Sequence, residues 1–115
     1  NLDDHLRNHG FLWQDNTGWR LSPAYDLNPV PGDLKPRVLT TSIDLDEGTC
    51  SLDLLEESAE YFGLGLEQAR GIIREVATVT ATWRDVAGQF GARSAEIARM
   101  ASAFEHEDLA RALRF

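Results

Sequence analysis

Asn1-Leu-Asp-Asp-His-Leu-Arg-Asn8 opens the chain, and the pair Tyr25-Asp26 follows farther along. The first eight residues gather two aspartates, a histidine and asparagine side chains, and a further aspartate follows a predicted hairpin. Carboxylate and carboxamide oxygens are the protein ligands that Mg²⁺ prefers, and phosphoryl transfer needs such a cation beside a phosphate. The pattern therefore predicts a metal- and phosphate-binding site within residues 1–29.

Between these two polar segments the sequence predicts a β-hairpin. The aromatic-rich runs His9–Gln14 and Trp19–Ser22 flank the segment Asp15–Gly18, whose composition is typical of a tight turn. Gly18 can adopt the positive φ that closing such a turn requires. Each run carries a tryptophan beside the turn, and we expect the two rings either to pair across the hairpin or to cover the helices.

The middle of the chain is predicted to be a connection with one short strand. Residues 25–35 contain two prolines and are followed by a third, which favours an ordered, extended loop. Residues 37–43 are rich in β-branched side chains and predict a strand that ends in the turn-like segment 46–49. The sequence does not reveal the partner of this strand.

The remainder has the periodicity of helices. Ser51 is a suitable N-cap for a helix that Gly63 and Gly65 would end. Its apolar residues recur at helical spacing: Leu52, Leu55, Ala59 and Phe62. Toward the C-terminus two more helices are predicted, one capped by Ser94 and a short last one over residues 107–113. The inward residues of the helix after Ser94 would be Ile97, Met100, Ala101 and Phe104.

The longest periodic stretch runs from Ala69 to Phe90 and predicts one helix of about six turns with a single buried stripe. Gly88 and Gly91 bracket its end. The stripe comprises Ala69, Ile72, Ile73, Val76, Val79, Thr80, Trp83, Val86, Ala87 and Phe90.

Together these features predict a single, mainly α domain over residues 1–115, a helical bundle with a small N-terminal β-hairpin. Residues 1–29 would carry the catalytic and metal-binding motifs. Residues 30–50 would form a loop with a short strand, and residues 51–115 the bundle. Because the chain starts at a dense polar motif and not at methionine, we expect it to be part of a larger protein.

Composition narrows the possible functions. With 43% hydrophobic and 26% charged residues the chain is typical of a globular protein. Its net charge of -8 argues against a nucleic-acid-binding surface. No apolar window is long enough to span a membrane, no signal peptide is visible, and the single cysteine excludes an internal disulfide. We therefore expect a cytoplasmic protein.

The spacing of the polar residues matches what a protein kinase requires. In kinases a catalytic aspartate precedes a metal-binding asparagine by five residues, and a second metal-binding aspartate follows later. Asp3 and Asn8 have this separation, and Asp26 follows the hairpin that could fold it back beside them. The spacing by itself is weakly specific, and the hairpin with Tyr25-Asp26 strengthens it.

The motif N-x-D-x-H-x-x-N at residues 1–8, followed by a hairpin and by Leu21-Ser-Pro-Ala-Tyr-Asp-Leu-Asn28, resembles the C-terminal region of HipA-like serine/threonine kinases. Those kinases are the toxins of bacterial type II toxin–antitoxin pairs. The resemblance implies a fold like the kinase C-terminal lobe, transfer of the ATP γ-phosphate to Ser or Thr of a protein target, and an antitoxin partner.

The resemblance also implies residue roles. Asp3 falls on the catalytic aspartate, and Asn8 and Asp26 fall on the residues that bind Mg²⁺. The implied nucleotide-binding residues are His5, Leu6, Arg7, Asn8, Tyr25 and Asp26. Arg7 stands where many members have lysine, so the phosphate contact there would differ, because a guanidinium is a planar fork and an ammonium a point charge.

Two parts of a kinase are absent from the sequence, a glycine-rich loop over the phosphates and a strand lysine. The resemblance places both upstream of residue 1, so we expect the chain alone to be inactive and its N-terminal loop to be frayed or displaced. One alternative is a helical interaction module without chemistry. Others are a divalent-metal hydrolase using Asp3, His5 and Asp26, and a zinc site at Asp3, Asp4 and His5.

Overall fold

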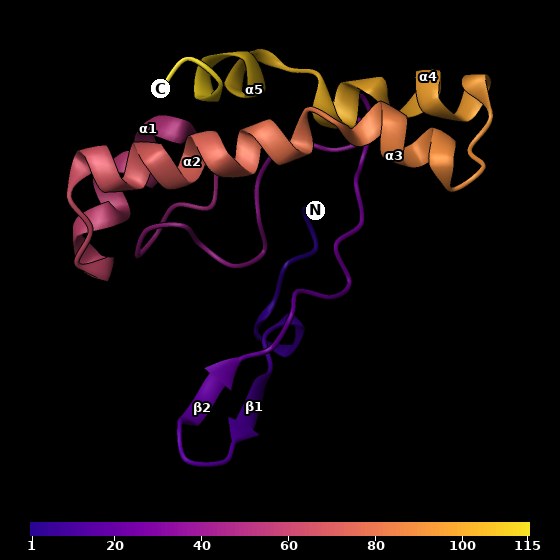
Figure 1. Cartoon of the computed structure of the whole chain (residues 1–115). Coiled ribbons are helices and arrows are strands. Elements are labelled where there is room, and N and C mark those ends of the chain that lie inside the picture. The colour runs from indigo at the N-terminus through magenta and orange to yellow at the C-terminus, as the bar shows by residue number, and fades with distance from the viewer.

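The computed structural model describes all of residues 1–115. It contains five α-helices and a two-stranded antiparallel sheet, so the predicted mainly α fold with a small N-terminal hairpin is confirmed (Figure 1). The elements are a 3-10 turn at Leu6–Asn8, β1 (Phe11–Gln14), β2 (Gly18–Leu21), α1 (Leu52–Ser58) with a 3-10 extension over Ala59–Phe62, α2 (Leu66–Thr80), α3 (Trp83–Gln89), α4 (Ser94–Phe104) and α5 (Glu107–Ala112).

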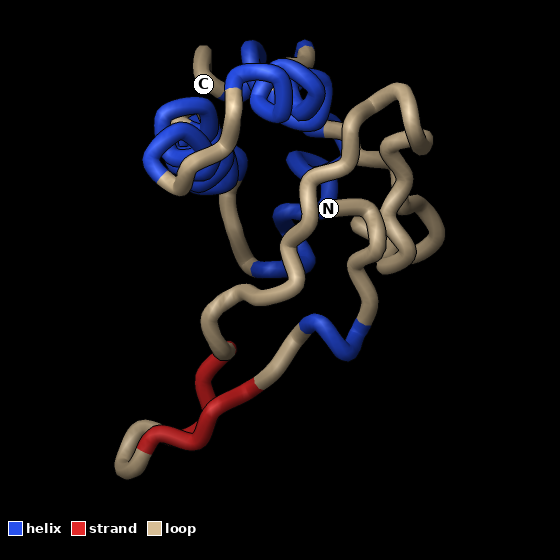
Figure 2. Tube along the Cα trace, turned by 90° about the vertical axis from the view of Figure 1, so that its right-hand side faces the viewer, coloured by secondary structure: helices blue, strands red, loops and turns tan.

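The hairpin forms as predicted and projects away from the helices, as both views show (Figures 1 and 2). Phe11 pairs with Leu21, and the turn is closed by Gly18 at a φ of 84°. Trp13 and Trp19 lie opposite each other with ring centroids 5.6 Å apart, so the expected pairing of the two rings is confirmed. Apart from Gly18 at the turn, every residue of both strands is exposed, so the hairpin is held to the chain only at its base.

The predicted strand over residues 37–43 is wrong. The segment forms a single antiparallel bridge between Val38 and Thr49, flanked by a hydrogen bond from the Leu39 amide to the Gly48 carbonyl at 2.7 Å. A ladder cannot continue because the next two amides, of Thr40 and Thr41, donate instead to carbonyls of the N-terminal segment. Residues 37–43 are thus hydrogen-bonded to two different segments, the loop that follows them and residues 2–4.

Local signals placed α1 correctly. The Ser51 side chain accepts a hydrogen bond from the Leu54 amide at 3.4 Å, so Ser51 is the N-cap. Gly63 ends the 3-10 extension at a φ of 69°, with its amide and that of Leu64 donating back to Glu60 and to Ala59. This pair of bonds is the Schellman motif that a positive-φ glycine permits. Gly65, predicted as part of the stop, instead precedes α2 as its N-cap.

The single six-turn helix predicted over residues 69–90 is wrong. The structure breaks it between α2 and α3, where the Thr82 hydroxyl donates to the Val79 carbonyl at 2.8 Å and so competes with the helical backbone bonds. The break also lets Trp83 stack on Phe104 of α4, with ring centroids 4.5 Å apart and planes 9° apart. A tertiary contact therefore replaces a continuous helix.

The predicted buried stripe is also only partly right. Ala69, Ile73 and Ala77 are buried, but Val79 is 69% exposed and Phe90 is 88% exposed. Ile72, Val76 and Val86 are exposed as well. Only the face of α2 that carries Ile73 and Ala77 packs against α5, so Ile72, Val76 and Val79 are exposed within α2 itself. Val86 and Phe90 lie beyond the break, in α3 and at its end.

Helix α4 begins one residue earlier than its predicted cap implies. Ser94 is its first residue, and Arg93 is the N-cap, whose amide donates to the Glu96 side chain at 2.8 Å. Glu96 thus forms the half of a capping box in which the third helical residue accepts a bond from the N-cap amide. The four residues predicted to face inward on this helix, Ile97, Met100, Ala101 and Phe104, are all half-buried.

The apolar core is small and lies where α2 meets α5. Ile73, Ala77 and Ala112 form it, and Leu52, Leu109 and Phe115 pack against it. The radius of gyration is 15.8 Å, against about 13 Å expected for a compact domain of this length, because the hairpin extends from the bundle. None of the helices combines the length and the apolar character that crossing a membrane would require.

Replacing Gly48 with alanine is expected to destabilise the chain. A Cβ there would lie 2.7 Å from the Leu39 carbonyl oxygen, a backbone atom that cannot move without breaking the bridge. We expect the free energy of unfolding in urea to fall by about 1–3 kcal/mol. The matched control is Gly88→Ala in α3, where the Cβ meets open space and a helix interior favours alanine by up to about 1 kcal/mol. Equal effects of both changes would contradict this account.

Candidate functional site

The hairpin brings Asn8 and Asp26 together, as the sequence predicts. The Asn8 side-chain amide donates to Asp26 Oδ2 at 3.0 Å, and Asn8 is the most buried polar residue of the N-terminal region. Asp26 adopts a left-handed φ of 58°, a conformation that aspartate tolerates better than most residues. The Asn28 side-chain amide donates a hydrogen bond to the other carboxylate oxygen, Asp26 Oδ1, at 2.7 Å. Two oxygen-bearing side chains are thus fixed next to each other.

The turn before Asn8 is held by its own hydrogen bonds. The His5 backbone amide donates to the side-chain oxygen Oδ1 of Asn8 at 3.0 Å, and the Asn8 backbone amide donates to the His5 carbonyl at 2.8 Å. Tyr25 donates its hydroxyl to the Arg7 carbonyl at 2.7 Å, which ties the two predicted nucleotide-binding segments together. His5 Nδ1 is buried without a hydrogen-bond partner, whereas Leu6 is 81% exposed. The loop expected to fray is therefore folded onto the base of the hairpin.

Asp3 and Asn8 line different hollows of the surface. Asp3 lines an open hollow of about 270 Å³. The six lining residues are Leu2, Asp3, Lys35, Pro36, Val38 and Thr40. A neighbouring hollow of about 220 Å³ contains Asn8 and Tyr25. Sequence spacing did not reveal Lys35 as a neighbour of Asp3, because the two are far apart along the chain and only the tertiary fold joins their segments.

The donor atoms of Asn8 and Asp26 fit a hard cation. A carboxylate and a carboxamide provide the few oxygen ligands that Mg²⁺ takes from a protein, with water and phosphate completing its shell. In the structure the Asn8 side-chain nitrogen faces Asp26, and the Asn8 Oδ1 accepts a bond from the His5 backbone amide. The Asn8 carboxamide would therefore have to turn to present its oxygen to an ion that Asp26 also binds. No group of three or more His, Cys, Asp or Glu side chains gathers around a possible metal position, and this includes Asp3, Asp4 and His5.

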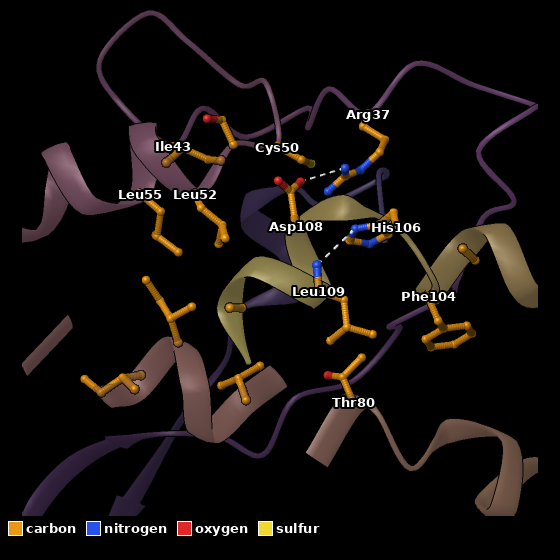
Figure 3. Close-up of a pocket in the computed structure, with 16 residues that line it drawn as sticks. Arg37, Ile43, Cys50, Leu52, Leu55, Thr80, Phe104, His106, Asp108 and Leu109 are labelled. Carbon is orange, nitrogen blue, oxygen red and sulfur yellow. Dashed lines mark hydrogen bonds and ion pairs between the residues drawn. The ribbon is translucent and has the colours of Figure 1, made fainter. Parts of the chain in front are cut away.

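A larger groove of about 360 Å³ lies in the bundle, between α1, α2 and α5 (Figure 3). Most of its lining is apolar, including Leu52, Ile73, Val76 and Leu109. At its polar end Arg37 forms an ion pair with Asp108 at 2.7 Å, and His106 Nδ1 accepts a bond from the Leu109 amide at 3.4 Å as the N-cap of α5.

This groove is not the best candidate for chemistry, although it is the largest. Its walls are the incompletely packed side chains of the helical core, and its charged residues already neutralise each other. One smaller hollow contains the Asp3 carboxylate, which forms no ion pair, and the Lys35 ammonium group, and the other is lined by Asn8, whose side chain is bonded to Asp26. Reactive groups gather there, so the candidate site is the region around Asp3, Asn8 and Asp26.

Comparison with known proteins gives one match. The model of the family described as HipA-like C-terminal domain matches residues 1–83 of the 115. No curated protein and no solved structure matches the chain. The matched range includes the hairpin, the residues around Asp3, Asn8 and Asp26, and helices α1 and α2, whereas α4 and α5 lie beyond it.

Replacing Asn8 with alanine is expected to loosen the turn at His5. The substitution removes the acceptor of the His5 amide, so hydrogen exchange at this amide should become about two- to tenfold faster in NMR measurements. Asn28→Ala is the matched control, because Asn28 binds the same Asp26 carboxylate but not the turn. If Asn28→Ala accelerates exchange at His5 equally, the turn depends on the Asp26 carboxylate and not on the Asn8 side chain.

The pH dependence of stability is expected to include a contribution from His106. Burial, and secondarily the charge of Arg37, lower the pKa of His106 below its usual 6.5, and Asp108 offsets part of this. Below about pH 6.5 the unfolded chain therefore binds more protons than the folded chain, so the free energy of unfolding falls as the pH drops.

We expect the midpoint of urea unfolding to decrease between about pH 7.5 and 5.5. His106→Asn, which keeps an acceptor at the N-cap, should make this decrease smaller. Identical decreases in both proteins would contradict a contribution from His106.

Proposed function

The chain belongs to the HipA-like C-terminal domain family, and from this premise we propose that it carries the catalytic and metal-binding residues of a serine/threonine protein kinase. The observation that carries the proposal is the bond between Asn8 and Asp26 across the hairpin. A kinase needs such a pair of oxygen ligands beside a catalytic aspartate.

In this proposal Asp3 is the catalytic base. Its carboxylate accepts the proton of a serine or threonine hydroxyl while the hydroxyl oxygen forms a bond to the γ-phosphorus of ATP and ADP leaves. Asn8 and Asp26 would hold Mg²⁺, which would neutralise phosphate charge. His5, Leu6, Arg7 and Tyr25 complete the nucleotide-binding region, with the Tyr25 hydroxyl fixing the backbone at Arg7.

The family's description as a C-terminal domain supports the further proposal that phosphate-cradling parts lie outside residues 1–115. The many exposed large apolar side chains are consistent with packing against another part of the protein. On this basis the whole protein is the cytoplasmic toxin of a toxin–antitoxin pair, and it arrests growth by phosphorylating a protein target.

The second candidate function is a non-catalytic interaction module for an antitoxin or another partner. The observation that favours it is the hairpin, whose apolar side chains face solvent: Phe11, Leu12, Trp13, Trp19 and Leu21. A two-stranded hairpin is only marginally stable by itself, so a partner covering these side chains would be stabilising. The two functions are compatible, since a kinase lobe can also be a docking surface.

Substituting the aspartates in the full-length protein tests the kinase proposal. Asp3→Asn should lower kcat for protein phosphorylation by about 10²–10⁴-fold with little change in the KM for ATP, because only proton acceptance is lost. Asp26→Asn should raise the KM for Mg·ATP as well. Asp15→Asn in the hairpin turn is the control and should leave both constants unchanged. Retention of full phosphorylation by both site variants would refute the proposal.

The chain alone is expected to bind Mg·ATP only weakly, because the glycine-rich loop and the strand lysine are not among its residues. Isothermal titration calorimetry on residues 1–115 measures this directly. A dissociation constant of about 1 μM or tighter would show that the nucleotide site is complete within this chain.

A further inference from the structure

The hollow beside Asp3 is built from two segments that the fold brings together. Leu2 and Asp3 form one wall, and residues 35–40 form the other. Both the amide and the hydroxyl of Thr40 donate to the Leu2 carbonyl, at 3.3 and 3.5 Å, so the walls are joined by hydrogen bonds. The hollow is therefore a defined part of the fold.

The hollow holds two opposite charges that do not neutralise each other. The Asp3 carboxylate and the Lys35 ammonium group both line it, yet neither takes part in an ion pair. Lys35 is the only lysine of the chain. Most of the arginines, in contrast, are paired with carboxylates of the chain. Each charge in the hollow is thus free to bind a group of another molecule.

The loop that carries Lys35 is anchored to the bundle. The Gly32 amide donates to the Ser102 hydroxyl at 3.1 Å, and Asp33 forms an ion pair with Arg99 of α4 at 3.0 Å. Pro31 is buried and Pro36 follows Lys35 directly, which restricts the backbone further. A cation on a restrained loop loses less conformational entropy when it binds an anion than one on a flexible loop.

The position of Lys35 indicates whether it binds the nucleotide or the protein substrate. The residues proposed to bind nucleotide and Mg²⁺, including Asn8, Tyr25 and Asp26, do not line this hollow. Only the proposed base does, so the hollow lies on the side of the acceptor hydroxyl. The hollow also has an apolar wall, formed by Leu2, Pro36 and Val38, along which an extended segment of the protein substrate could lie.

We propose that Lys35 is a specificity-determining residue that binds an acidic side chain next to the phosphorylated serine or threonine of the protein substrate. This inference rests on the kinase function proposed above. With the hydroxyl at Asp3, a neighbouring Asp or Glu reaches the ammonium group in the same hollow. The net charge of -8 does not oppose this contact strongly, since charges more than about 8 Å apart are screened at physiological ionic strength.

Peptide phosphorylation by the full-length protein tests the inference. Serine peptides carrying Asp or Glu at each flanking position are compared with peptides carrying Asn or Gln there, using Lys35→Gln, Lys35→Glu and the control Arg20→Gln. Arg20 is an exposed cation of β2 outside the hollow. For the unmodified protein we expect kcat/KM to be about 1.5- to 5-fold higher for the acidic peptide at one position, the range of an exposed charge pair.

Lys35→Gln should abolish this preference without changing kcat/KM for the neutral peptides, and Lys35→Glu should reverse it, so that kcat/KM is higher for the neutral peptide than for the acidic one. Arg20→Gln should retain it. An equal preference in the Lys35→Gln variant, or no preference in the unmodified protein, would overturn the inference while leaving the kinase function intact. A uniform loss on all peptides with a raised KM for ATP would overturn it by assigning Lys35 to the nucleotide. If the unmodified protein phosphorylates no peptide or protein, the kinase function itself fails and the inference falls with it.

Discussion

Two consecutive backbone hydrogen bonds, from the amides of Thr40 and Thr41 to the carbonyls of Leu2 and Asp4, join the N-terminal motif to the rest of the structure. They close a loop of more than thirty-five residues, which includes the whole hairpin. The segment they hold is tied in turn to α5 by the ion pair between Arg37 and Asp108. The position of the candidate site relative to the bundle depends on this chain of contacts.

The site itself combines a restrained backbone with free side-chain chemistry. Asp26 is held in a left-handed conformation that is uncommon outside glycine, and hydrogen bonds from Asn8 and Asn28 hold its carboxylate in place. Such conformations concentrate at functional sites, where the surrounding contacts maintain them. Asp3, in contrast, keeps its carboxylate unpaired, as a base for an incoming hydroxyl must.

Ion pairs supplement a core that is too small to orient every helix and loop. Hydrogen bonds from Arg99 and Arg111 lower the pKa of Asp33 and of Asp53, and they connect the proline-rich loop to α4 and α1 to α5. Exposed pairs of this kind contribute little stability individually. Their main effect here is to set where loops and helices lie relative to each other, including the loop that carries Lys35.

Residue types and short spacings were enough to predict the hairpin with its Gly18 turn, the Ser51 cap, the Gly63 stop and, across the hairpin, the contact of Asn8 with Asp26. These depend on backbone preferences and short loops, which residue types reveal directly. Tertiary structure alone decided the break before Trp83, the loss of the strand at residues 37–43 and the approach of Lys35 to Asp3. Each depends on partners distant in sequence, whose identity no local pattern encodes.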